Sequence, residues 1–183
     1  MANCPARRKL AARCLLAGLL LACAGGAPAD DVLEQRVKSA FLFNFAKFVS
    51  WPPGKLAGGA STIVFCLLER DTLAPALDEA LSGKTIDDHP LQLRRVARVE
   101  DFRGCHVAYL GAMDPARLPA ALAGLDGGGV LTVYEADGAQ HDGVVRFYLD
   151  ERKVRFEINE AAAQREGLQL SSRLLSVASV VRD

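Results

Sequence analysis

The run Thr62-Ile63-Val64-Phe65-Cys66-Leu67-Leu68 decides the fold class of this chain. It is short, almost entirely apolar and opens with β-branched residues, which is the pattern of a strand covered on both faces. A strand buried on both faces is typical of a sheet whose two sides are covered, most often by helices. The run therefore predicts the interior of a layered α/β domain.

Apolar residues at three- and four-residue steps predict helices before and after this strand. These helices are expected over 31–49, 72–81, 118–125 and 160–165. Other short apolar runs predict further strands, over 91–96, 105–110 and 130–134. Helices and strands thus alternate along the chain, which favours an α/β arrangement.

The end of the chain has a different pattern. Residues 145–149 and 154–158 alternate apolar with polar side chains around the polar turn 150–153, which predicts a β-hairpin with one apolar face. The closing segment 171–181 places its larger apolar residues on one helical face: Leu174, Leu175, Ala178 and Val181. The prediction is a single compact α/β domain, a mixed sheet flanked by helices, with a C-terminal β-hairpin and helix.

The charges are unevenly distributed along the chain. It contains 22 basic and 22 acidic residues, but four of the basic ones and none of the acidic ones precede Asp30. The remainder carries 18 bases against 22 acids, a formal charge of −4. Phosphate binding needs a basic surface, so this balance argues against nucleic acid as the main partner.

Residues 1–29 are typical of a secretory signal peptide, which leaves 30–183 as the exported domain. Basic residues precede the apolar stretch 15–24, and Ala27-Pro28-Ala29 is a small-x-small cleavage site. The stretch is too short for a comfortable transmembrane helix. The alternative processing is lipid attachment at Cys23, because Leu20-Leu21-Ala22-Cys23 loosely resembles the box that directs it.

Cleavage after Ala29 leaves two of the five cysteines, Cys66 and Cys105. An even pair in an exported protein predicts one disulfide, which here would connect two parts of one sheet region. Two buried thiols are the alternative. A catalytic cysteine is not expected, because no positioned base is evident beyond the adjacent His106.

Motifs for catalysis or cofactor binding are incomplete. Gly83-Lys84-Thr85 matches the tail of a phosphate loop, but Asp78 stands where the leading glycine is required. The glycines at 127–129 precede a strand, the reverse of a dinucleotide-binding turn. The histidines are scattered and no C-x-x-C exists, which argues against a metal site. We therefore predict a binding protein without catalytic residues, cofactor or metal.

Trp51 follows an aromatic helix and allows two interpretations. Aromatic residues at helical spacing are usually buried, which would make Trp51 the cap of a core helix. Alternatively, Trp51 and Lys55 belong to an exposed surface for a ligand or a partner. The sequence leaves both interpretations open.

Three motifs in this chain resemble those of the YfiR-like family of periplasmic proteins. They read Phe41-x-x-Asn44-Phe45-x-x-Phe48-x-x-Trp51-Pro52, Phe156-x-Ile158-Asn159, and Gly167-Leu168-x-Leu170-Ser171-Ser172-x-Leu174-Leu175. They occur in the expected order over nearly all of the predicted exported domain. The Cys66–Cys105 pair also resembles a disulfide of that family.

The resemblance implies a compact α/β fold, often dimeric, in the periplasm. The best-known members repress a membrane-bound diguanylate cyclase by binding its periplasmic region, which restrains cyclic-di-GMP synthesis and biofilm formation. The implied partners are thus such a cyclase and a second copy of the chain. Family members can carry a second disulfide nearer the C-terminus, but here no cysteine follows Cys105, so only one bond could report the redox state of the periplasm.

For the partner surface we expect residues of the C-terminal segment, namely Leu170, Arg173 and Leu174. The competing hypothesis is a periplasmic sensory module for a small molecule, without a cyclase partner. In that case Trp51, Lys55 and Arg173 would contact an anionic or aromatic ligand.

Overall fold

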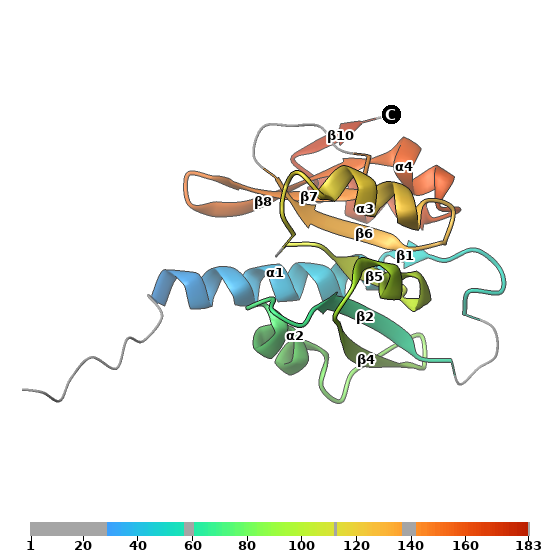
Figure 1. Ribbon diagram of the computed structural model, residues 1–183, viewed down its shortest axis with the longest axis horizontal. Coiled ribbons are helices and arrows are strands. Elements are labelled where there is room, and N and C mark those ends of the chain that lie inside the picture. Colours follow the sequence, from blue (N-terminus) through green and yellow to red (C-terminus); the bar gives the residue numbers. More distant parts are fainter. Residues whose placement is uncertain (1–28, 57–60, 112, 137–141, 183) are drawn as a thin grey trace, which may run out of the picture.

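The computed structural model describes residues 29–56, 61–111, 113–136 and 142–182 (Figure 1). Its helices are α1 (Ala29–Lys47), α2 (Ala74–Leu81), the 3₁₀ helix η1 (Val99–Gly104), α3 (Leu118–Leu125), α4 (Glu160–Arg165) and α5 (Ser172–Val177). Its strands are β1 (Val49–Ser50), β2 (Ile63–Leu68), β3 (Thr85–Ile86), β4 (His89–Val96), β5 (Val107–Tyr109), β6 (Leu131–Glu135), β7 (Val145–Asp150), β8 (Lys153–Asn159), β9 (Gln169–Leu170) and β10 (Val180–Arg182). Helices flank a mixed sheet in one domain, which confirms the predicted fold class.

The eight-stranded sheet has the order β10-β8-β7-β6-β5-β2-β4-β3. Strand β2, the run that decided the fold class, lies inside it and pairs in parallel with β4 on one side and β5 on the other. From β2 the chain first winds to β4 and then returns past β2 to β5, β6 and β7. This order places the topological switch point of a doubly wound sheet between β2 and β5.

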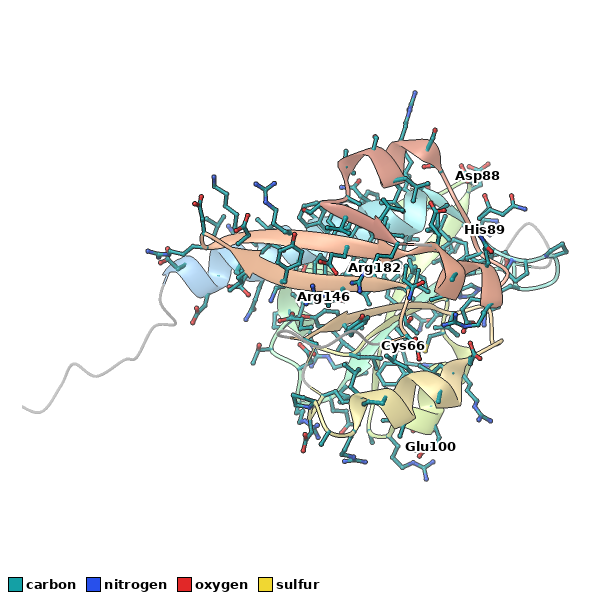
Figure 2. The ribbon with its side chains drawn as sticks, turned by 90° about the horizontal axis from the view of Figure 1, so that it is seen from above. Cys66, Asp88, His89, Glu100, Arg146 and Arg182 are labelled. Carbon is teal, nitrogen blue, oxygen red and sulfur yellow. A yellow bond between two sulfur atoms is a disulfide. The ribbon has the colours of Figure 1, made fainter. Side chains whose placement is uncertain are left out.

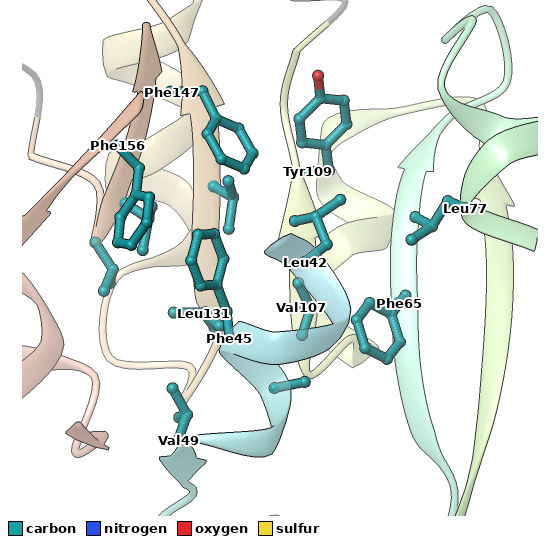
Figure 3. Close-up of a cluster of buried hydrophobic side chains, with 14 of the residues drawn as sticks. Leu42, Phe45, Val49, Phe65, Leu77, Val107, Tyr109, Leu131, Phe147 and Phe156 are labelled. Atoms are coloured by element: carbon teal, nitrogen blue, oxygen red, sulfur yellow. The ribbon is translucent and has the colours of Figure 1, made fainter. Parts of the chain in front are cut away.

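One face of the sheet packs against α1 and α2. Leu42 and Phe45 of α1 are fully buried there. The ring centroid of Phe45 lies 5.6 Å from that of Phe147 and 4.8 Å from that of Phe156, so α1 joins its aromatic stripe to β7 and β8 (Figure 3). The amphipathic helix predicted over 31–49 is thereby confirmed as a core helix, although it ends at Lys47. Aromatic contacts of this kind contribute beyond the area they bury.

The opposite face of the sheet packs against η1 and α3. A second, smaller cluster there contains the residues Cys66, Leu68, Val96, Phe102, Cys105, Ala108, Leu110, Leu118, Leu122, Leu125, Val130 and Tyr134. Both cysteines belong to this cluster, so any bond between them lies under η1 and α3 and away from α1.

Strands β7 and β8 form the predicted hairpin, with a register from Val145↔Ile158 to Asp150↔Lys153. The two turn residues have φ angles of 47° and 64°, as a two-residue primed turn requires. Figure 2 shows Arg146 on this hairpin with Arg182 of β10 near it. Both arginines form ion pairs with Glu157, at 2.8 Å for Arg146, and so attach β10 to the sheet edge.

The helix predicted over 171–181 is too long. Helix α5 ends at Val177, and β10 then pairs in parallel with β8. Val181, expected on the helical face of Leu174, instead stands in register with Ile158 and is 40% exposed. The free edge of β8 supplies partners for the backbone of residues 180–182, and helical periodicity in the sequence contains no information about that edge.

The predicted signal peptide and the lipid-attachment alternative at Cys23 lie outside the described residues, apart from Ala29. Within the described ranges, no helix combines the length and the apolar character needed to cross a membrane.

Candidate functional site

The predicted disulfide joins Cys66 of β2 to Cys105, which directly follows η1. The Cα atoms are 6.0 Å apart, within the range that a disulfide spans. Cys66 is 1% exposed and Cys105 is fully buried. The bond therefore fixes the end of η1 to the central strand, and the alternative of two free buried thiols is excluded in this structure.

Trp51 lies where the chain leaves α1 and β1 and passes over the amino ends of β2 and β5. Its side chain is half-buried, and its Nε1–H donates to the backbone oxygen of His106 at 3.3 Å. The two rings meet edge to face, with their centroids 5.7 Å apart. Trp51 thus caps the core, as one of the two interpretations of the sequence predicted.

His106 connects three segments through both nitrogens of its ring. Nδ1 accepts the backbone N–H of Val64 at 3.0 Å, and Nε2–H donates to the backbone oxygen of Lys55 at 3.1 Å. This pattern requires the neutral ring protonated on Nε2, because a proton on Nδ1 would face the N–H of Val64. Burial lowers the pKa of His106, the charges of Lys55 and His89 lower it further, and the hydrogen bond to Lys55 opposes them.

Lys55 and Glu166 hold the glycine turn that precedes β6. Lys55 Nζ donates to the oxygen of Gly128 at 2.6 Å. Glu166, 7% exposed, accepts the N–H of Gly127 at 3.0 Å and that of Val130 at 3.1 Å. Burial lowers the pKa of Lys55, and the carboxylate of Glu166 opposes that shift. The turn thus presents its N–H groups to an anion, and that anion is the chain's own Glu166.

We call Trp51, Lys55, His106 and Glu166 the amino-edge cluster. Sequence reasoning selected Trp51 and Lys55 as ligand residues, and the structure shows their polar atoms bonded to backbone oxygens. Among the described residues, no hydrogen bond or ion pair joins Arg173 to either of them. Glu166 was not predicted as a site residue, because nothing in its local sequence pattern marks a carboxylate that binds a turn. His106 was considered only as a base adjacent to Cys105.

A second polar cluster lies at the carboxyl ends of β5 and β6. Lys38, 7% exposed, lies 2.5 Å from a carboxylate oxygen of Glu34 and 2.7 Å from one of Glu135. Burial alone would lower the pKa of Lys38, but Glu135 and Glu34 outweigh it and raise that pKa. The hydroxyl of Tyr109 donates to Glu135, and burial raises the pKa of Tyr109 far above its ordinary value. This cluster, in which one lysine pairs with two glutamates, fixes α1 against the sheet.

The three residues predicted for the partner surface differ in exposure. Leu174 is 2% exposed and packs in the main core, whereas Leu170 is half-buried in β9, which pairs with Val49 of β1. Arg173 is exposed. In this structure, therefore, Leu174 and Leu170 position α5, and only Arg173 of the three is freely presented to a partner.

Exposed aliphatic side chains lie further along the chain, beginning four residues after Arg173. Val177 is 65% exposed, Val180 42% and Val181 40%. We call these three residues the valine segment. Val180 and Val181 lie on β10, the outermost strand at one end of the sheet order, next to β8. Large exposed apolar residues on an edge strand are unusual unless something covers them.

The fold and the two polar clusters indicate a general class of protein. The doubly wound domain has a buried disulfide and two polar clusters that are satisfied internally. Within the described part of the chain, no group of three or more His, Cys, Asp or Glu residues is placed to hold a metal ion. The domain also exposes apolar side chains at one edge of its sheet, a feature often found where a protein binds another.

The chain belongs to the YfiR/HmsC-like family, whose model matches residues 35–179. This confirms the resemblance drawn from the three sequence motifs. Membership indicates a periplasmic regulatory protein. No curated protein sequence matches the chain.

Two solved structures superpose on parts of this chain. A conserved domain protein from Vibrio cholerae superposes with a TM-score of 0.54 at 9% identity, over 79% of this chain and 60% of that one. The ABC domain in complex with L-Trp from Streptococcus pneumoniae gives a TM-score of 0.49 at 11% identity, over 78% of this chain and 61% of that one. This chain thus spans about three fifths of the length of each solved structure. The first similarity shows the fold alone, and the second supports no inference.

Proposed function

We propose that this protein binds the periplasmic region of a membrane-bound diguanylate cyclase and represses it. Cyclic-di-GMP synthesis and biofilm formation would fall as a result. The observation that carries the proposal is the family match over residues 35–179. Exposed apolar side chains at the C-terminal end of the domain support it. A signal peptide over 1–29 would deliver the domain to the periplasm.

The valine segment together with Arg173 supplies the proposed binding surface. The buried core of an interface is more apolar than its rim, and arginine is enriched among the residues that contribute most binding energy. Leu174 and Leu170 lie beneath or beside this surface and hold α5 in place. Their expected role in partner binding is therefore indirect, through the position of α5.

Repression of this kind is a population shift. A repressor changes cyclase activity only to the extent that it binds the inactive conformation more tightly than the active one. Because α5 and β10 depend on the folded sheet for their position, partial unfolding of the domain would weaken the surface. Loss of the Cys66–Cys105 bond would in this way release the cyclase.

Co-purification with the periplasmic region of the cyclase tests the proposal. The wild-type protein should retain that region, and Val177→Asp should retain at least tenfold less. Leu149→Asp is the matched control, because Leu149 is 54% exposed at the tip of the β7–β8 hairpin. Equal retention by all three proteins would exclude the valine segment, and no retention by the wild type would exclude the cyclase partner.

A homodimer is part of the same proposal, on the strength of the family resemblance. Sedimentation of the wild-type protein over a range of concentrations tests it. Val177→Asp separates the two roles: if the valine segment pairs two copies, this variant will sediment as a monomer. If it binds only the cyclase, the variant will sediment as the wild type does.

The structure provides no specific observation in favour of a small-molecule sensor. Trp51 and Lys55, the residues expected to bind a ligand, use their polar atoms on the backbone of the chain itself. A ligand at this place would first have to replace those bonds.

A further inference from the structure

We propose that Arg94 makes the Cys66–Cys105 disulfide easier to reduce, by stabilising the thiolate that Cys105 becomes when the bond opens. The inference does not depend on the proposed partner, because it concerns an equilibrium within this chain. It assigns to Arg94 the electrostatic stabilisation of one product of a redox reaction.

The position of Arg94 follows from the sheet. On β4 it stands in register with Cys66 of β2, so its side chain rises from the same face of the sheet as that cysteine. Its Nη2 lies 3.0 Å from the sulfur of Cys105 and 2.9 Å from the backbone oxygen of Asp101. The oxygen of Asp101 fixes the guanidinium group, and the sulfur of Cys105 lies directly against it.

The surroundings of the guanidinium group leave it space and supply no carboxylate partner. Gly104 leaves the space it occupies, since a Cβ at that position would stand 3.2 Å from Nη2 of Arg94. In the described part of the chain, no carboxylate forms an ion pair with Arg94, and the side chain of Asp101 pairs with Arg98 instead, at 3.4 Å. Nε of Arg94 is buried without a hydrogen-bond partner. In the oxidised protein the positive charge therefore faces a neutral sulfur.

Reduction supplies the missing anion. The thiolate of a dithiol reductant attacks Sγ of Cys66, a mixed disulfide forms, and Cys105 leaves as a thiolate beside Arg94. The second thiol of the reductant then attacks its own sulfur in the mixed disulfide and releases Cys66 as a thiol. The protein gains two electrons, and the reductant becomes a cyclic disulfide. A cation next to a thiolate stabilises it, which favours the reduced side of this exchange.

Burial of the disulfide affects how fast it is reduced, whereas Arg94 affects the equilibrium between its oxidised and reduced forms. Cys66 is 1% exposed and Cys105 fully buried, so a reductant reaches the bond only after η1 has moved away. The bond should thus react slowly, but its equilibrium should lie further towards reduction than that of a disulfide with no neighbouring cation. The test is accordingly an equilibrium measurement.

Three proteins are equilibrated with mixtures of reduced and oxidised dithiothreitol: the wild type, Arg94→Met and Arg95→Met. The measurement is repeated in half-unit steps from pH 6 to pH 9. Acid quenching, alkylation and mass spectrometry then give the reduced fraction. We expect the Arg94→Met disulfide to be about tenfold harder to reduce, which is about 30 mV for a two-electron couple. Arg95 is the matched control, because it is exposed and points to the other face of the same strand.

Arg94→Lys keeps the charge and is expected to recover part of the difference. The pH series distinguishes a redox role from a structural one. In the wild type the potential should become less dependent on pH at a lower pH than in Arg94→Met, because the Cys105 thiolate binds its proton less tightly. A potential for Arg94→Met that equals the wild type, or a bond that is easier to reduce, overturns the proposal. The proposal is also overturned if Arg94→Met lowers the thermal stability of both redox forms equally and leaves the potential unchanged.

Discussion

Nδ1 of His106 accepts the backbone N–H of Val64 at 3.0 Å, across 42 residues of sequence. The donor belongs to the central strand, and the histidine directly follows a disulfide cysteine. The same ring donates from Nε2 to Lys55, so one neutral imidazole joins β2, the start of β5 and the segment after Trp51. A second proton on this ring would break the first of these bonds.

The pH dependence of stability follows from this bond. Burial lowers the pKa of His106 in the folded protein below its ordinary 6.5, so the unfolded chain binds the proton more readily. Stability from His106 is present above pH 6.5 and is lost as pH falls below it, by at most about 1.4 kcal/mol per pH unit. Urea unfolding at pH 7.5, 6.5 and 5.5 measures this loss.

His106→Gln removes the titration at this site while it keeps an N–H donor on the side chain. We expect a lower stability at pH 7.5 for this variant and a flatter dependence on pH below 6.5. Leu174→Ala serves as the control, because it lowers stability without removing a titratable group, and it should keep the slope of the wild type. If His106→Gln kept that slope as well, another group would have to cause it.

Removal of the disulfide should lower stability. The bond joins residues 39 apart in the sequence, for which the chain-entropy model gives about 4 kcal/mol. Cys66→Ala or Cys105→Ala should therefore shift the urea midpoint down and, under the proposed function, raise cyclase output in cells. An unchanged melting temperature of the wild type with and without reductant, with the reduced state verified, would contradict this mechanism.

Glu166 should contribute to stability although it lies in no hydrophobic cluster. Its carboxylate accepts two backbone N–H groups of the glycine turn, and Glu166→Ala would leave both without a partner. We expect a loss of about 1–3 kcal/mol, the cost of one unsatisfied buried donor, because the N–H of Val130 is buried whereas Gly127 is exposed to water. Glu79→Ala, on the exposed side of α2, is the control and should change stability by less than about 0.5 kcal/mol. Chemical denaturation compares the two variants.

Leu174 and Val177 should separate folding from binding. Leu174 is 2% exposed and Val177 is 65% exposed, although both lie on α5. Leu174→Ala should lower the free energy of unfolding by about 2–5 kcal/mol, whereas Val177→Ala should leave it nearly unchanged. Partner binding should respond to Val177→Ala at constant stability. A stable Leu174→Ala protein would show that α5 does not depend on this contact.

The elements with local, repeated patterns were predictable from the sequence. The alternation of residues 145–149 and 154–158 located the hairpin, because a strand presents successive side chains to opposite faces. The continuous apolar run at 62–68 located the central strand, because a strand covered on both faces needs apolar side chains at successive positions. Cys66 and Cys105 could be paired because the predicted export left only two cysteines.

The polar site could not be predicted in the same way. Trp51 and Lys55 were selected by residue type, but type does not show whether a side chain points to solvent or to a backbone oxygen. Glu166 lies 36 residues from Val130, whose N–H it accepts, and no local spacing relates them. Val181 is exposed because β10 pairs with the edge strand β8, and no local pattern predicts that pairing.

The sequence by itself determined the α/β class, the order of most helices and strands, and the identity of the two linked cysteines, because these depend on periodicity and composition within short windows. The tertiary structure alone decided that Arg94 lies against the sulfur of Cys105, that Leu174 is buried, and that Val177 is exposed. Such relationships depend on which strands become neighbours. Strand order is fixed by the packing of the whole sheet rather than by any one segment.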